Sequence, residues 1–253
     1  MIFHFTILLW TIIFSLGLEF IAINPFFPTW NWYIFSILPL LVISLLAVER
    51  VTKRSTDVFL PGLLSLSAPT LLSLIDSSAQ RQVFVVLSAL MYYFALLGLY
   101  RLHHAPEDKT AHAFINTSAV AGLFFYYSGI FGFYLNFSFP LWGLMTLYFF
   151  GTALTSYKTF TGISPEDRRK ERRMLYSTLL GLFLAEMAWV MSFWPFGYLT
   201  AGVLVLVFFF LAWDIAFDAF HKVLSLRKAG LRILFFFILI GILLSSASWR
   251  ILI

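Results

Sequence analysis

Residues 164–218 read SPEDRRKERRMLYSTLLGLFLAEMAWVMSFWPFGYLTAGVLVLVFFFLAWDIAFD, and this stretch decides the fold. A basic run at 168–173 precedes an apolar stretch over 174–193, and a short turn separates that stretch from a second one over 197–218. A helix that crosses the hydrocarbon core of a bilayer needs about 20 mostly apolar residues. The sequence therefore predicts two membrane-spanning helices joined by a tight turn.

The composition of the whole chain extends this prediction. Of its 253 residues, 61% are hydrophobic and 11% are charged, whereas an ordinary soluble domain is roughly 45–50% apolar and about 25% charged. The mean hydropathy is +0.91. These values exclude a soluble enzyme, a nucleic-acid-binding domain and a disordered chain. Because the sequence has no cysteine, disulfides and thiolate metal sites are excluded as well.

Nine stretches have the length and apolar character of membrane spans. We therefore predict an all-α, polytopic transmembrane helix bundle that forms one domain over 1–253. The third stretch contains Pro61 and Pro69, and if it does not cross fully, eight spans remain. The nine predicted spans are 3–23, 32–48, 58–75, 83–101, 111–134, 139–158, 174–193, 197–218 and 231–250.

The basic residues predict the orientation of these spans. Cytoplasmic loops of membrane proteins carry an excess of Lys and Arg. With nine spans, only Arg81 and Arg250 fall on one side. We therefore expect the N-terminus in the cytoplasm and the C-terminus outside. The cytoplasmic set is Arg50, Lys53, Arg54, Arg101, Lys109, Lys158, Arg168, Arg169, Lys170, Arg172, Arg173, Lys222, Arg227, Lys228 and Arg232.

Two loops carry residues typical of helix starts. Ser164-Pro-Glu-Asp167 offers a serine cap, a proline and acidic side chains near the amide ends. Ala105-Pro-Glu-Asp108 offers a similar start with a poorer cap. Aromatic residues precede both loops at similar spacing, which suggests hairpin repeats over 91–146 and 147–210. Chance similarity between apolar segments is the alternative explanation.

Glu186 is the most distinctive candidate residue, since it lies deep within the seventh predicted span. Embedded ionisable side chains usually face a bundle interior or a wet cavity. We expect Glu186 either to form a proton or cation site or to bridge helices through hydrogen bonds.

A second group of polar residues shares one face near the inner end of the eighth predicted helix, at helical spacing: Asp214, Asp218, His221 and Lys222. Aspartate and histidine can shuttle protons or bind a metal. The spacing of the two aspartates resembles half of the metal site of phospholipid head-group transferases, whose other motifs are missing. An interfacial cluster with an ordinary ion pair between residues four apart is the alternative.

Histidines gather in the loop before the fifth span, where His103, His104, Asp108 and His112 occur. His103 and Asp108 have the spacing used by glycerolipid acyltransferases, whose later motifs are absent here. His104, Asp108 and His112 also have a spacing that could hold a metal ion. A solvated loop is the simplest interpretation, so we predict no metal site and no cofactor.

The basic run before the seventh span predicts contact with anionic lipid headgroups on the cytoplasmic face. Its members are Arg168, Arg169, Lys170, Arg172 and Arg173. The sequence has no lysine within a span and no phosphate-binding loop, so a retinal Schiff base and a nucleotide-hydrolysing motor are not indicated.

The segment 185–198, AEMAWVMSFWPFGY, resembles an uncharacterised family of small multi-pass membrane proteins from candidate-phylum bacteria. The resemblance rests on Glu186, Trp189, Phe193, Pro195 and the apolar helix that follows. It implies a bacterial inner-membrane setting and no particular activity.

Three functions remain open from the sequence. The first is a non-catalytic membrane component, namely a subunit, a scaffold or a lipid-interacting protein with a possible protein partner. The second is a small permease or proton-coupled transporter that uses Glu186. The third is an intramembrane lipid-modifying enzyme that uses the acids and histidines on the cytoplasmic side. The lack of catalytic motifs favours the first, with the lipid bilayer and its anionic lipids as partners and no nucleic acid.

Overall fold

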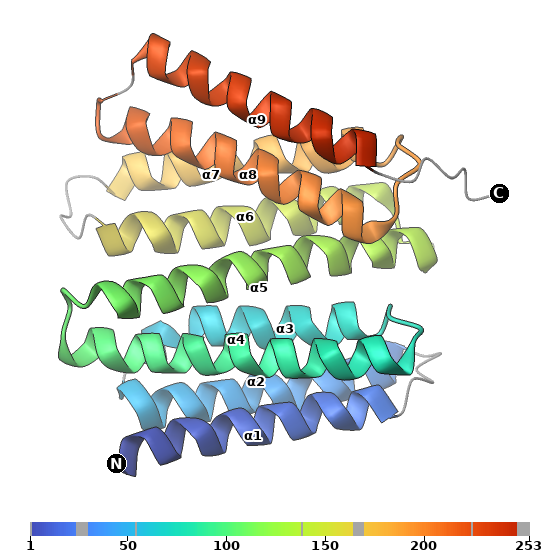
Figure 1. Cartoon of the computed structure of the whole chain (residues 1–253), viewed down its shortest axis with the longest axis vertical. Coiled ribbons are helices and arrows are strands. Elements are labelled where there is room, and N and C mark those ends of the chain that lie inside the picture. Colours follow the sequence, from blue (N-terminus) through green and yellow to red (C-terminus); the bar gives the residue numbers. More distant parts are fainter. Residues whose placement is uncertain are drawn as a thin grey trace. The chain divides into compact units, whose positions relative to one another are not determined.

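A computed structural model describes residues 2–23, 30–53, 55–137, 139–163, 170–223 and 225–246, and these residues are almost entirely helical (Figure 1). Each of the nine predicted apolar stretches corresponds to one α-helix in this part of the chain. A short 3₁₀ helix, η1 (Ser55–Val58), precedes the third α-helix. The α-helices are α1 (Ile2–Ile23), α2 (Trp30–Thr52), α3 (Phe59–Leu72), α4 (Ser78–His104), α5 (Lys109–Asn136), α6 (Leu141–Ile163), α7 (Lys170–Met191), α8 (Tyr198–Phe220) and α9 (Leu226–Ser246).

The helices group into two compact units, Met1–Gly129 and Ile130–Ile253, and the division falls within α5. The sequence alone predicts a single domain, because its apolar stretches follow one another without a linker. The suggested repeats over 91–146 and 147–210 each contain the end of one helix, a complete helix and the start of the next. This shared element order does not test a duplication, which stays a prediction.

In the first unit, α1 packs against α2 and α4, and α3 packs against α2 and α4. The rings of Phe14 on α1 and Tyr92 on α4 stack with centroids 4.1 Å apart, and both side chains are fully buried. Close approach of α4 and α5 depends on Gly98, where a Cβ would lie 3.1 Å from the backbone oxygen of Ala111. Large aromatic side chains and small residues thus together fill the space between these helices.

In the second unit, α7 packs against α6 and α8, and α8 packs against α9. A Cβ on Gly181 of α7 would lie 2.8 Å from the backbone oxygen of Phe149 on α6, so glycine is needed at this crossing. Phe160 of α6 packs within 5.0 Å, between ring centroids, of Trp213 and Phe220 on α8. These aromatic contacts hold α6, α7 and α8 together near their basic ends.

Six of the described helices are long and apolar enough to cross a membrane, by length and composition. They are α1, α4, α5, α7, α8 and α9. The helix α3 has 14 residues, which gives it a length of about 21 Å against a hydrocarbon core of about 30 Å. Both α2 and α6 have 23 residues but are not among the six. The structure is thus compatible with a multi-pass membrane protein.

The start of α5 differs from the prediction. Residues 105–108 do not belong to the helix, which begins at Lys109. The Asp108 carboxylate accepts hydrogen bonds from the backbone N–H groups of Thr110 and Ala111, at 2.9 and 3.4 Å. Aspartate is a far better N-cap than alanine, so the helix starts after Asp108 and not after Ala105. The other predicted start, Ser164–Asp167, lies outside the described residues.

Candidate functional site

The two faces of α7 differ sharply in exposure. One face is buried and includes Ser177, Gly181, Leu184 and Ala188. The opposite face is exposed and forms a stripe with helical spacing, which we call the α7 stripe. It consists of Leu175, Leu179, Leu182, Glu186 and Trp189, and Phe193 continues it beyond the helix end.

Glu186 lies within this exposed stripe and not in the packed interior of the second unit. Among the described residues, its carboxyl group makes no hydrogen bond or ion pair. It lies about 20 Å along the helix from Arg173 at the basic end. An embedded carboxylate is expected to face the interior of its own bundle. Glu186 instead points away from the helices of the second unit that pack against α7.

Another carboxylate within an apolar helix is that of Glu19 near the end of α1. Its Oε1 atom accepts a hydrogen bond of 2.7 Å from the Gln82 side-chain amide on α4. Nearby, the Arg81 side chain donates to the backbone oxygen of Ile75 at 2.5 Å. The side chains of Glu19 and Arg81 therefore find partners within the first unit.

The four polar residues at the end of α8 do not form a single site. The Asp218 carboxylate pairs with Arg232 of α9 at 2.6 Å, and not with Lys222 as residue spacing had suggested. Lys222 lies two residues beyond the end of α8 with φ 59°, and its side chain is exposed. His221 lies with Nδ1 2.9 Å from the backbone oxygen of Phe217. Arg232 also lies 3.5 Å from the backbone oxygen of Asp214.

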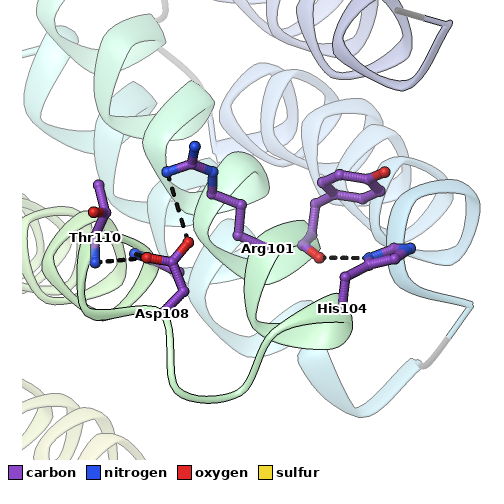
Figure 2. A network of polar contacts seen from close by, with 6 residues as sticks. Arg101, His104, Asp108 and Thr110 are labelled. Atoms are coloured by element: carbon purple, nitrogen blue, oxygen red, sulfur yellow. Dashed lines mark hydrogen bonds and ion pairs between the residues drawn. The ribbon is translucent and has the colours of Figure 1, made fainter.

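Figure 2 shows the polar contacts between α4 and the start of α5. Arg101 lies 3.7 Å from the capping Asp108, with both side chains partly exposed. Nδ1 of His104 lies 2.9 Å from the backbone oxygen of Tyr100, and Nε2 of His112 lies 3.0 Å from that of Pro106. His103 is exposed. These groups stabilise helix ends, and no set of three or more potential metal ligands gathers within the described ranges.

The basic run that opens α7 divides into different environments. Lys170 and Arg172 are exposed, whereas Arg173 is 4% exposed and lies on the buried face of α7. Arg168 and Arg169 lie outside the described residues. Of the described members, Lys170 and Arg172 have the exposure that headgroup contact requires, and Arg173 does not.

Sequence reasoning missed a buried polar cluster in the first unit. Ser44 of α2 lies 2.5 Å from the Ser65 hydroxyl of α3 and 3.0 Å from the Tyr92 hydroxyl of α4. All three side chains are fully buried. The Ser118 hydroxyl of α5, by contrast, donates to the backbone oxygen of Met91 on α4 at 2.8 Å, a contact between helices that small polar residues in apolar stretches are expected to make. A single hydroxyl residue in an apolar stretch gives no indication of its partner, so the sequence offered no usable pattern.

Within each unit, the described candidate acids and histidines make contacts at helix ends and between helices. The arrangement defines an all-helical protein whose apolar helices are compatible with insertion into a membrane. Residues 7–249 match the model of a family of proteins of unknown function, DUF5656, and the chain belongs to this family. No curated protein and no solved structure matches the chain.

Proposed function

We propose that this protein is a non-catalytic component of a bacterial inner membrane that binds a second membrane-spanning polypeptide through the α7 stripe. The observation that carries this proposal is the position of Glu186, which is exposed between apolar side chains, five residues before the end of a helix of membrane-spanning length. Such a residue is costly next to lipid, by about 2.5–3.5 kcal/mol on insertion scales for a charged side chain at the bilayer centre. A partner helix that offers a hydrogen-bond donor or a positive charge at the same depth would offset this cost.

The contacts of the other candidate residues support a non-catalytic role. Asp108 caps α5 and pairs with Arg101, and Asp218 links α8 to α9 through Arg232. Groups that are engaged in helix capping and ion pairs have a structural purpose that needs no substrate. The exposed position of Glu186 favours binding over proton transfer through the second unit, because the packed helices of that unit lie on the opposite side of α7.

The proposed topology places the basic helix ends in the cytoplasm. Exposed Arg50 and Lys53 at the end of α2 and exposed Lys222 at the end of α8 support this assignment. We propose nine crossings, with the N-terminus inside and the C-terminus outside. The resemblance of 185–198 to proteins of candidate-phylum bacteria supports the bacterial setting.

Cross-linking from defined positions tests the proposed interface. A photoreactive phenylalanine analogue at Trp189 in the α7 stripe should capture one membrane polypeptide in the native membrane. The same analogue at Phe150, which is exposed on α6, provides a matched control and should not capture it. Peptide mapping should place the cross-link in an apolar segment of the partner that contains a basic or amide side chain.

The variant Glu186→Leu should abolish this capture, and native mass spectrometry should show loss of a partner held at fixed stoichiometry. Asn116→Leu replaces another exposed polar side chain and should leave the complex intact. Unchanged capture by Glu186→Leu, capture of a second copy of this chain, or equal capture from both positions would overturn the proposal.

A further inference from the structure

A second feature of α7 adjoins the α7 stripe, with which it shares Leu179, and faces α8 and α9. It is a groove of about 540 Å³ that is lined almost wholly by apolar side chains, a size within the range of about 300–1,000 Å³ typical of small-molecule sites. Its walls include Leu179 and Phe183 of α7, Ala212 and Ile215 of α8, and Ile233 and Phe237 of α9.

The groove has the length of one lipid chain. On α7 it extends from Tyr176 to Met187, a helical distance of about 16 Å. One leaflet accounts for half of the roughly 30 Å hydrocarbon core, so an acyl chain reaches about 15 Å. The wall formed by α9 is open to the outside, since the Phe237 side chain is 60% exposed.

The charge at one end of the groove indicates which lipid fits. Tyr176, Ala219 and Ile233 mark the end that lies next to the basic termini of α7, α8 and α9. The exposed side chains there are mainly positive, with Glu171 as the acidic exception, whereas the remaining length of the groove is apolar. The exposed basic residues are Lys170, Arg172, Lys222, Arg227 and Lys228.

We infer that the groove binds one acyl chain of an anionic phospholipid from the cytoplasmic leaflet, with the headgroup on the basic residues at the ends of α8 and α9. A zwitterionic lipid could occupy the same apolar walls, but it would gain much less from the positive end. A helix of another polypeptide would leave those charges without a counterpart. This inference does not depend on the partner proposed for Glu186.

The first test follows the acyl chain. The full chain is reconstituted in vesicles of phosphatidylglycerol and phosphatidylcholine, with a trace of either lipid carrying a photoreactive acyl chain. Cross-links from the phosphatidylglycerol probe should concentrate on groove residues such as Phe183 and Ile215. Ala212→Trp, which fills the groove, should remove them, and Leu234→Trp on the exposed side of α9 should not. Glu186→Leu should leave them unchanged.

The second test follows the headgroup and does not alter the packed helices. Reversing two exposed charges in Arg227→Glu/Lys228→Glu should lower the preference for phosphatidylglycerol over phosphatidylcholine about tenfold in native mass spectrometry. Arg50→Glu/Lys53→Glu makes the same change in net charge at the end of α2 and should have little effect. Equal retention of the two lipids by the unmodified protein, or cross-links that spread evenly over exposed apolar surface, would overturn the inference, as would equal effects of the two charge reversals.

Discussion

Glu19 and Glu186 are both acidic residues within apolar helices, yet their carboxyl groups lie in different environments in the two units. Glu19 accepts a hydrogen bond from Gln82 within the first unit, whereas Glu186 is exposed on α7. The same contrast extends to other side chains. The first unit buries Tyr92 within hydrogen-bond reach of Ser44, and the second leaves an apolar groove open beside α9.

This difference shows that a polar group in an apolar helix can have one of two roles. A group that meets a donor inside its own unit stabilises that unit. A group that faces outward contributes nothing to the packing around it, and its cost is offset only when something else binds. The first unit thus holds its embedded Glu19 carboxylate through an internal hydrogen bond, and the second leaves the Glu186 side chain exposed.

The largest expected effect tests whether the first unit depends on its buried aromatic cluster. Tyr92→Ala removes a fully buried ring that stacks on Phe14, and we expect the free energy of unfolding to fall by about 3–5 kcal/mol. Trp189→Ala removes a 46% exposed ring from the second unit and should change it by less than about 1 kcal/mol. Denaturant unfolding in detergent micelles measures both, and similar losses would break the comparison.

The second largest loss of stability is expected from disturbing the close packing of α6 against α7 in the second unit. Gly181→Leu places a side chain against the backbone of Phe149, and we expect a loss of about 1–3 kcal/mol. Gly241→Leu on α9, where a Cβ would meet nothing within 4 Å, provides the control. If thermal unfolding temperatures of the two variants agree, the close crossing of α6 and α7 is not needed.

A smaller effect distinguishes the two ion pairs. Arg232→Leu breaks a 2.6 Å pair with Asp218 that attaches α9, and it should lower stability by up to about 1 kcal/mol. Arg101→Leu breaks a 3.7 Å pair in the first unit and should cost only a few tenths of a kcal/mol. Hydrogen exchange should show faster opening of α9 in the first variant alone. Faster exchange in both variants, or in neither, would contradict this ranking.

The smallest expected losses of stability come from replacing Glu19 and Glu186, and they test the comparison between these two residues directly. Glu19→Leu leaves the Gln82 amide without its acceptor, and we expect a loss near 0.6 kcal/mol, the average for such bonds between membrane helices. Glu186→Leu should leave the isolated protein unchanged within about 0.5 kcal/mol. A double-mutant cycle with Gln82→Leu isolates the pair energy. A marked loss for Glu186→Leu would place its partner inside this chain.

The positions of the helices could be predicted from sequence because long apolar stretches have few alternatives in a membrane. The direction in which a side chain points could not. Most of α7 is apolar all round, so nothing local indicates whether Glu186 faces inward or outward. Likewise, the partner of Asp218 is Arg232 on the next helix, 14 residues away, and spacing along one helix suggested Lys222 instead. The contact between Ser44 and Tyr92 joins residues 48 apart, which no local pattern encodes.

The short helix α3 has a consequence for how the chain is made. Most of its residues are buried, including Leu64, Ser65, Ala68 and Leu71. With 14 residues, it is too short to partition into a bilayer by itself as an ordinary span does. During synthesis we therefore expect α3 to enter the membrane only together with α4, after the ribosome has passed residue 104. Insertion of α3 would then require the presence of α4. The order in which the helices are synthesised would therefore affect assembly of the first unit.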